Sequence, residues 1–293
     1  ELEPGLNALF GLEYKRYENQ HAEIYTTESS DRAFEEEVML SGFAQAQTKS
    51  EGAGVTFDNA QETYTARYTH ETVALAFSIT EEAIEDNLYD RLASRYTKAL
   101  ARSMANTKQV KAVAPLINGL PTNDAFDSGD GVSLFNTAHP TIAGTVKNTL
   151  TTQADLNETS LEQSLIDIAA MTDERGLKIA ARGVKMIVPS ELQFQAERLM
   201  KSQGRTGTAD NDINAIVSMG MVPQGYRVNN FLTDPDAFYI ITDVPNGMKY
   251  FERAAMKTAM EGDFDTGNVR YKARERYSFG VSDFRGIFGV EGA

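Results

Sequence analysis

Two rows of basic side chains have a spacing that could bind acidic groups. The first row recurs at helical intervals and spans an arc of about 60° at roughly 100° per residue. Its members are Arg91, Arg95, Lys98 and Arg102. The second row recurs at every other residue, which places its side chains on one face of a strand. Its members are Arg270, Lys272, Arg274 and Arg276. Each row is predicted to present one line of positive charge.

A line of charge of this kind has two interpretations. It is commonly the solvated face of a folded domain. The alternative is complementarity to acidic partners, which are either phosphates or the carboxylates of neighbouring subunits. Because the whole chain carries a net charge of −14, we favour ion pairs between subunits for the strand row. For the helix row, a surface that faces phosphates and a solvated surface both stay open.

No other group of residues predicts a catalytic, metal or cofactor site. The three histidines share no metal-binding spacing. They are His21, His70 and His139. A calcium loop that begins at Asp263 would need a carboxylate at its twelfth position, which is Arg274. The stretch 204–208 lacks the Gly-Lys-Ser/Thr of a phosphate-binding loop, and no paired-acid signature stands out. We therefore predict that the chain is not an enzyme and needs no cofactor.

The composition is that of an acidic protein with a core of its own. The chain has 293 residues, 41% of them hydrophobic, which suits one large domain or two smaller ones. Its charge argues against non-specific nucleic-acid binding over the whole surface. The absence of cysteine excludes disulfides and thiolate sites, and it suits a reducing cytosol. No apolar run reaches the ~20 residues that cross a bilayer. No secretory signal precedes Glu1, and trimming or processing would explain the absent initiator methionine.

One long helix is expected to carry the first basic row. Its pattern runs from Ile79 to Ala114, with Ser78 or Thr80 as its cap, capping-box spacing between Ser78 and Glu81, and an end or kink at Pro115. The predicted apolar face spans an arc of about 80° and is widened by three further residues. It consists of Leu88, Leu92, Tyr96, Ala99, Val110 and Ala114, with Ala93, Leu100 and Met104 beside them. Acidic residues precede basic ones, as the helix dipole favours, and a length of ~50 Å would span a domain.

A strand with period-two alternation precedes this helix and is expected to reach from Tyr64 to Ile79. Residues 54–57 are expected to pair with it across a turn at 58–61, which would give a long two-stranded hairpin. Because an isolated ribbon is marginally stable in water, such a hairpin is predicted to be an assembly element. The second basic row is expected on a later strand that pairs with 255–261.

Residues 181–254 are predicted to form a compact α/β unit without the βαβ run of a doubly wound sheet. The other predicted elements are a helix capped at Thr159 and ended by Gly176, a strand at 184–188, a helix from Ser190 to Met200, an exposed loop at 202–212, a helix at 213–219, and strands at 225–232, 237–242 and 248–252. Residues 1–30 show no amphipathic pattern. They are expected to be an arm that packs on another surface, such as a second subunit, or a frayed terminus.

Nine short segments, in order along most of the chain, resemble one known family. They are 69–71 (THE), 77–82 (FSITEE), 85–89 (EDNLY), 134–140 (LFNTAHP), 208–214 (TADNDIN), 232–237 (LTDPDA), 263–267 (DFDTG), 271–274 (YKAR) and 282–286 (SDFRG). Together with the predicted order of elements, they make the chain similar to the tailed-phage major capsid proteins of the Hong Kong 97-type fold. Within that family the sequence resembles the Mu-like major head subunit branch.

The resemblance implies an α+β architecture with four parts. They are an amino-terminal arm at 1–30, an extended β-hairpin loop and a peripheral domain with the spine helix at 31–180, an α/β axial domain at 181–254, and a return to the peripheral domain at 255–293. The extended loop would lie within 43–79, and 202–212 would be the loop that meets at five-fold and six-fold axes. The spine helix would lie toward the shell interior, which would turn Arg91 to Arg102 toward packaged DNA. Family members cross-link Lys to Asn between subunits, but no such pair maps onto this chain, so non-covalent assembly is expected.

The function implied by the resemblance is structural. The chain would self-assemble into the pentamers and hexamers of an icosahedral phage head that encloses double-stranded DNA. Implied partners are other copies of the chain, the packaged DNA, and portal, scaffold, head protease or decoration proteins, with no membrane. The protein would assemble in the host cytoplasm and be located in the virion. One alternative is an encapsulin-like compartment shell, which shares the fold and loads protein cargo. Another is a soluble acidic hydrolase with its site in 181–254, which only the abundance of carboxylates supports.

Overall fold

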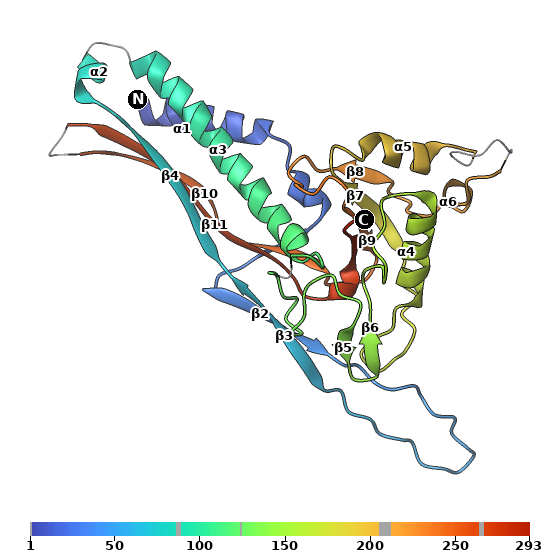
Figure 1. Ribbon diagram of the computed structural model, residues 1–293. Coiled ribbons are helices and arrows are strands. Elements are labelled where there is room, and N and C mark those ends of the chain that lie inside the picture. Colours follow the sequence, from blue (N-terminus) through green and yellow to red (C-terminus); the bar gives the residue numbers. More distant parts are fainter. Residues whose placement is uncertain (1, 86–88, 124, 205–211, 264–266) are drawn as a thin grey trace. The chain divides into compact units, whose positions relative to one another are not determined.

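The computed structural model describes residues 2–85, 89–123, 125–204, 212–263 and 267–293 (Figure 1). The chain divides into two compact units. Unit 1 consists of Glu1–Glu35, Tyr68–Ala112 and Tyr250–Phe279. Unit 2 consists of Glu36–Arg67, Val113–Lys249 and Gly280–Ala293. Among the described residues, no helix is both long enough and apolar enough to cross a membrane.

The sheet of unit 1 has the strand order β1-β10-β11-β4. Its strands are β1 (Thr26–Ser29), β10 (Met248–Gly262), β11 (Val269–Val281) and β4 (Glu71–Ile79). Helices α1 (Leu2–Arg16) and α3 (Tyr89–Asn118) lie on the same side of this sheet (Figure 1). The two helices, β4 and β11 share one buried cluster: Leu6, Phe10, Ile79, Ala93, Leu100, Ala101, Met104, Tyr271 and Ala273. The alternation along β11 therefore turns one face into the core and leaves the basic face outside.

The long helix differs from the prediction at both ends. β4 continues to Ile79, so Ser78 lies in a strand and the predicted capping box is wrong. Thr80, the other predicted cap, accepts a hydrogen bond from the Ala83 amide at 3.4 Å. A short helix, α2 (Glu81–Glu85), follows, and residues 86–88, which include the predicted apolar Leu88, lie outside the description. α3 then runs through Pro115 for three more residues. Because Pro115 lies in the last turn, its missing N–H removes one bond of the ladder without ending the helix.

The buried side of α3 is only partly the predicted one. Leu100 and Met104 are buried as expected. Tyr96 and Val110 are 44% and 49% exposed, because the helix turns the side that carries Met104 toward the sheet. Lys108 shares that buried side. The predicted face rests on apolar residues alone, so it includes the exposed Tyr96 and Val110 and omits the buried Lys108.

The first thirty residues contain a helix that the sequence pattern did not indicate. α1 spans half of the expected arm, and a 3-10 turn, η1 (Gln20–Glu23), follows it. Leu6 and Phe10 are buried in the cluster with α3 and β11. Asn7 Oδ1 accepts a hydrogen bond from the Tyr271 hydroxyl at 2.8 Å. Two apolar residues one turn apart suffice when a helix packs on an existing surface, so the amphipathic signal stays weak and the expectation of a frayed terminus is wrong.

The hairpin is formed by a different pair of strands from the pair that was predicted. β3 (Glu62–Thr69) pairs with β2 (Phe34–Leu40), and residues 54–57 belong to no strand. The strand expected from Tyr64 to Ile79 is two strands, which His70 separates. The sequence does not predict β2 as a strand, because the acidic run at 35–37 interrupts any alternation of apolar and polar residues. Residues 41–61, the connection between β2 and β3, form a loop without helix or strand, which we call the ribbon loop.

The sheet of unit 2 has the order β12-β9-β7-β8, in which β7 and β8 are parallel and the other pairs antiparallel. Its strands are β12 (Ile287–Val290), β9 (Phe238–Thr242), β7 (Gly183–Val188) and β8 (Tyr226–Val228). The other elements are the hairpin of β5 (His139–Thr141) and β6 (Gly144–Val146), helices α4 (Glu158–Ala170), α5 (Gln193–Lys201) and α6 (Ala215–Ser218), and the 3-10 turn η2 (Phe284–Gly286).

Several predicted boundaries change in this part of the chain. The expected strands at 248–252 and 255–261 are one strand, β10. β12 was not predicted, because its four residues show no alternation and are all buried. The helix capped at Thr159 is instead capped by Asn157, whose side chain accepts from the Ser160 amide at 2.9 Å. That helix ends at Ala170 rather than at Gly176.

Candidate assembly surfaces

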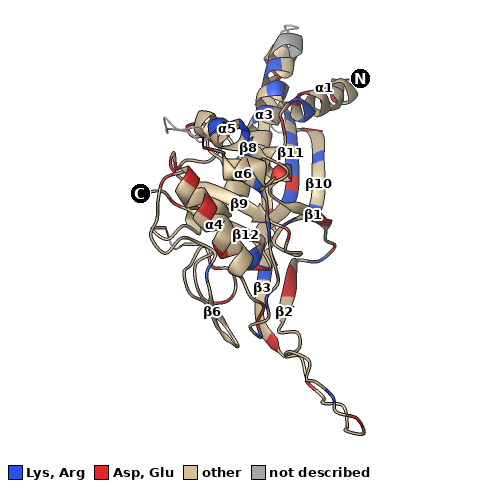
Figure 2. Ribbon diagram, turned by 90° about the vertical axis from the view of Figure 1, so that its right-hand side faces the viewer, with Lys and Arg blue, Asp and Glu red and all other residues tan. Residues whose placement is uncertain are grey.

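The second basic row lies along the outer face of β11. It occupies alternate positions: Arg270, Lys272, Arg274 and Arg276. The first three side chains are exposed and the fourth is half-buried. Their partners across the ladder in β4 are small or bear a hydroxyl: Ser78, Ala76, Ala74 and Thr72. Lys257 of β10 is exposed between Met256, which packs on the core, and Thr258, so it extends the positive face. Figure 2 shows the Lys and Arg positions of β10 and β11 in blue.

Two side chains of this row interact with other groups of the same chain. Arg270 pairs with Asp263, and Arg276 Nη2 donates to the Ala33 carbonyl at 3.5 Å. Lys272 and Arg274 have no ion pair among the residues that the structure describes. The middle of the row is therefore open to carboxylates or phosphates from outside the chain.

The first basic row lies on the solvent side of α3. Arg95, Lys98 and Arg102 are exposed, whereas the side chain of Arg91 lies outside the description. α3 packs on the face of β11 that carries Tyr271, so this row and the row on β11 lie on different faces of unit 1. The structure does not bring the two predicted rows into one site.

The ribbon loop exposes apolar side chains that the sequence analysis did not single out. Phe43 is 61%, Val55 69% and Phe57 93% exposed. Leu40, at the end of β2, is 59% exposed as well. Scattered exposed apolar residues are common, but four of them around one loop indicate a surface that another surface covers.

A buried charged cluster fixes the segment before β12. Arg285 Nη2 lies 2.6 Å from Glu174 Oε1, and Arg285 Nη1 lies 3.2 Å from Asp283 Oδ1. The guanidinium also covers the ring of Phe284, with 4.4 Å between its carbon and the ring centroid. Burial raises the pKa of Asp283, and Arg285 acts against this shift. Because these charges are enclosed and paired, they are not available to a partner, and removing one of them would leave another buried charge uncompensated.

His139, the first residue of β5, is buried beside this cluster. Its ring stacks on Phe284 with the centroids 3.8 Å apart. Its Nδ1 lies 2.6 Å from Asp130 Oδ2, and its Nε2 lies 3.0 Å from Asn148 Oδ1. Burial acts to raise the pKa of Asp130, but hydrogen bonds from His139 and Ser128 hold it below its ordinary value. Both ring nitrogens are within hydrogen-bond distance of these side-chain oxygens. No group of three metal ligands occurs in the described part of the chain.

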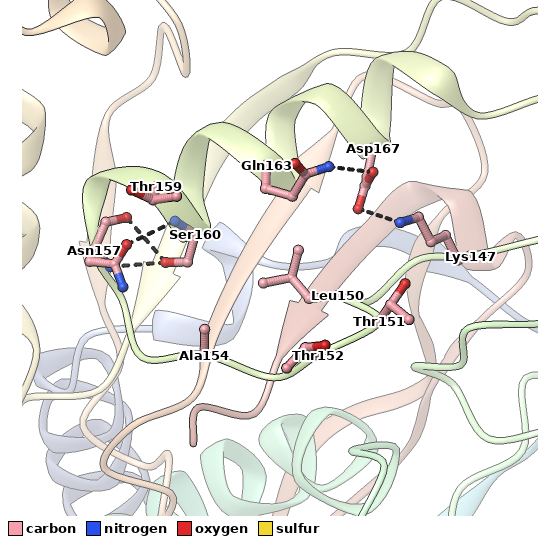
Figure 3. Close-up of a pocket in the computed structure, with 10 residues that line it drawn as sticks. All are labelled: Lys147, Leu150, Thr151, Thr152, Ala154, Asn157, Thr159, Ser160, Gln163 and Asp167. Carbon is pink, nitrogen blue, oxygen red and sulfur yellow. Dashed lines mark hydrogen bonds and ion pairs between the residues drawn. The ribbon is translucent and has the colours of Figure 1, made fainter.

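The pocket in Figure 3 lies beside α4 and has a volume of about 400 Å³. Lys147 Nζ lies 2.7 Å from Asp167 Oδ2, and Gln163 Nε2 donates to Asp167 Oδ1 at 3.0 Å. At the other end of the pocket, Asn157 and Ser160 form the cap of α4. The charged groups that line this pocket are paired with each other, and the lining contains no histidine that could serve as a base for a hydroxyl. The arrangement is that of a structural ion pair.

A second hollow, of about 500 Å³, borders the stretch in which the hydrolase alternative places its site. Leu165, Val184 and Met221 are among its lining residues, and the Arg182 amide donates to Asp243 Oδ1 at its edge at 2.8 Å. Elsewhere in that stretch, hydrogen bonds from Lys201 and Tyr226 lower the pKa of Glu197. A general acid in a hydrolase needs a raised pKa, so this carboxylate is unsuited to that role.

Comparisons with known proteins agree on one class of protein. A family model described as phage capsid protein matches residues 63–290. No curated protein matches the chain in sequence. The capsid of the cyanophage P-SCSP1u has a TM-score of 0.58 at 12% identity, over 92% of this chain and 86% of that chain. The capsid of an empty GTA particle has a TM-score of 0.57 at 16% identity, over 93% and 89%. The virus-like particle from Pyrococcus furiosus has a TM-score of 0.57 at 9% identity, over 98% of each chain.

These structures share the α+β fold predicted from the sequence, and the family model covers most of the chain. Proteins of this class associate with further copies of themselves into multimeric shells. The chain therefore belongs to the phage capsid protein family, as a tailed-phage major capsid protein with the Hong Kong 97-type fold.

Proposed function

We propose that the chain builds the pentamers and hexamers of an icosahedral head that encloses double-stranded DNA. The observation that carries this proposal is the ribbon loop, in which Phe43 and Phe57 are 61% and 93% exposed. Leaving a Phe side chain in water forgoes about 1.5–3 kcal/mol relative to burying it. A neighbouring copy can cover these rings with a surface that lies elsewhere on its own chain. Such a contact is heterologous, and heterologous contacts close into rings when the rotation permits.

The division of labour that we propose follows the resemblance. Residues 1–30 are the amino-terminal arm, 31–180 the extended loop and peripheral domain, 181–254 the axial domain, and 255–293 the return to the peripheral domain. Most of the axial loop proposed at 202–212 lies outside the described residues, so its role rests on the resemblance alone. Membership of the Mu-like branch likewise stays a prediction.

The two basic rows have separate roles in this proposal. The row on α3 faces packaged DNA, where exposed Arg95, Lys98 and Arg102 offset the repulsion between phosphates and an acidic shell. The row on β11 binds carboxylates of neighbouring subunits, which the net charge of −14 supplies in abundance.

The remaining parts of the proposal concern partners and location. Portal, scaffold, head protease or decoration proteins bind the assembled shell, and assembly takes place in the host cytoplasm without a membrane. The chain is not an enzyme, which the pairing of Lys147 with Asp167 in the pocket beside α4 supports. An encapsulin-like compartment shell is the second candidate, and native particles that contain protein cargo and no nucleic acid would favour it.

The experiment compares the purified chain with the double variant Phe43→Ser/Phe57→Ser by negative-stain electron microscopy and light scattering. We expect closed particles or capsomer rings from the unaltered chain and small species from the variant, with circular dichroism unchanged. The variant Gln45→Ser/Gln47→Ser, which alters the same loop without removing apolar area, is expected to assemble normally. Particles from the Phe variant at the parent's concentration would contradict the role of the loop. A monodisperse ~32 kDa monomer of the unaltered chain at every salt concentration would contradict self-assembly, because interfaces of shell size persist in solution.

A further inference from the structure

β4 is an edge strand whose second edge is open. The strand order β1-β10-β11-β4 places it at the end of the sheet of unit 1. It pairs with β11 in an unbroken antiparallel register from Glu71 opposite Tyr277 to Ile79 opposite Val269. No strand among the described residues pairs with its other side. The outward-pointing amide and carbonyl groups along this edge are therefore available to another strand.

This edge lacks the features that usually prevent pairing between sheets. Natural edge strands carry charges, prolines or bulges, or are very short. Between Glu71 and Ile79 the sequence is Thr-Val-Ala-Leu-Ala-Phe-Ser, with no charge, proline or glycine, and its register with β11 shows no bulge. Leu75, at the centre, is 46% exposed. An exposed edge of this length, with no charge between Glu71 and Ile79, is expected to be covered by another strand.

The exposed side of α3 continues the same surface. Its residues at alternating intervals of three and four are exposed and carry no charge: Tyr96, Ala99, Ser103, Asn106 and Val110. The ring of Tyr96 contacts that of Phe77 in β4 edge-on, with the centroids 5.6 Å apart. Val73, Leu75 and Phe77 share the helix-facing side of β4. One uncharged strip therefore joins the edge of β4 to this side of α3.

The sequence of β4 is complementary to itself when it is reversed about Leu75. In an antiparallel pair centred there, Leu75 meets Leu75, Val73 meets Phe77, Ala74 meets Ala76 and Thr72 meets Ser78. Each pair is compatible with antiparallel strands, since a branched residue meets an aromatic one and a hydroxyl meets a hydroxyl. We propose that β4 pairs with β4 of a second copy across a two-fold axis at Leu75, which joins two four-stranded sheets into one.

The charges are compatible with this occupant. Glu71 lies at the end of the strand, opposite Ile79 of the second copy, so no carboxylate faces a carboxylate. The basic rows of the two β11 strands would be separated by three strand spacings, about 14 Å. That distance exceeds the Debye length of about 8 Å at physiological salt, so the rows repel each other weakly. The two α3 strips would lie over the junction, where small residues such as Ala99 and Ser103 permit close approach.

This contact is isologous and two-fold, whereas the ring contacts proposed for the ribbon loop are heterologous. The pairing therefore goes beyond the proposed function, and it is tested separately. The chain has no cysteine, so a single introduced thiol reports on one position. Directly opposed Cα atoms of antiparallel strands are about 4.5–5.5 Å apart, which permits a disulfide. Diagonal neighbours are about 7–8 Å apart, which does not.

The experiment is oxidation of full-length single-cysteine variants, followed by non-reducing electrophoresis. Leu75→Cys is expected to form a covalent dimer that reductant reverses. Ala74→Cys and Ala76→Cys are expected to form no covalent dimer when each is oxidised alone, and to form one when they are mixed before oxidation. Ala255→Cys, at an exposed position of β10, measures random collision. Leu75→Cys dimers no more abundant than those of Ala255→Cys would overturn the pairing, and so would equal cross-linking by all four variants.

A second measurement distinguishes the pairing of β4 from the assembly of the chain into a shell. Combining Leu75→Cys with Phe43→Ser/Phe57→Ser is expected to leave the covalent dimer and abolish the particles. Particles from Leu75→Cys without any covalent dimer would overturn the pairing and leave the shell. A covalent dimer with no particles from the otherwise unaltered chain would support the pairing and contradict self-assembly.

Discussion

Lys108 Nζ lies 3.2 Å from Glu275 Oε2, and the two side chains are only 11% and 2% exposed. Lys108 interrupts the buried side of α3, and Glu275 interrupts the apolar face of β11, so each has its partner on the facing element. The Tyr14 hydroxyl donates to the same carboxylate oxygen at 3.2 Å. The ammonium lies 5.1 Å and 5.2 Å from the ring centroids of Tyr250 and Tyr277. Burial raises the pKa of Glu275, and Lys108 acts against this shift.

We predict that removing one partner of this pair destabilises the protein far more than removing both. Lys108→Met leaves a buried carboxylate without its cation, a loss worth about 3–5 kcal/mol. The double variant Lys108→Met/Glu275→Leu replaces the pair with apolar groups and is expected to lie within about 1–2 kcal/mol of the parent. Urea denaturation followed by circular dichroism measures both. A cost below about 1 kcal/mol for Lys108→Met would show that water reaches the carboxylate.

A second prediction concerns the pH dependence of stability through His21. Burial, helped by the charge of Lys108, lowers the pKa of His21 to about 4, and Gln109 Nε2 lies 3.0 Å from the His21 Nδ1 atom. The unfolded chain, with a pKa near 6.5, binds more protons than the folded chain between these values. Stability therefore falls as the pH drops from about 6.5 to about 4, by up to about 3 kcal/mol.

His21→Asn keeps an acceptor for Gln109 and removes the titration. We expect the variant to lose this part of the slope when the free energy of unfolding is measured from pH 4 to pH 7. Carboxylates contribute equally to both proteins, so the difference between the two curves isolates His21. Parallel curves would show that the imidazole accepts a proton in the folded state as readily as in the unfolded one.

The third prediction separates the two basic rows. Lys272→Glu/Arg274→Glu and Lys98→Glu/Arg102→Glu change the net charge equally, since each replaces two cations with two anions. We expect the variant in β11 to raise the concentration needed for assembly by at least about tenfold, because like charges across an interface cost several kcal/mol.

The α3 variant is expected to assemble normally and to retain less nucleic acid, as measured by the absorbance of purified particles at 260 nm and 280 nm. Raising the salt concentration should reproduce both effects in the unaltered protein. Equal loss of assembly in the two variants would mean that the rows differ only in position and not in role.

The fourth prediction concerns a close approach of two glycines in unit 2. A Cβ on Gly286 would overlap the Gly247 Cα, and a Cβ on Gly247 would lie 2.7 Å from the Gly286 Cα. Gly286→Ala is therefore expected to cost more than about 2 kcal/mol, because two backbones must separate. Gly5→Ala, where α1 leaves open space, is expected to stabilise the helix by about 0.5–1 kcal/mol. Thermal unfolding of both variants measures these two changes in stability, which are expected to have opposite signs. An unchanged stability of Gly286→Ala would contradict the close approach of the two backbones.

Local periodicity in the sequence was sufficient to predict secondary structure wherever a segment's own residues decide its conformation. The alternation at 270–279 and the apolar run at 237–242 both appear as strands in the structure. The resemblance of nine scattered segments predicted the family and the fold, which the comparisons confirm. Composition likewise predicted an acidic chain in which a basic row is the exception.

Packing between distant segments decided the rest. Lys108 lies on the buried side of α3 with Glu275 as its partner, and the two residues are 167 positions apart in the sequence. α1 is a helix with a weak pattern because Leu6 and Phe10 dock on α3 and β11. β2 pairs with β3 across the ribbon loop in spite of its acidic run, because cross-strand contacts outweigh local preference. The open edge of β4 can be identified only from the order of the strands in the sheet. The sequence determined which segments prefer helix or strand, and the tertiary structure determined which of their faces meet, because burial is a property of pairs of surfaces and not of one segment.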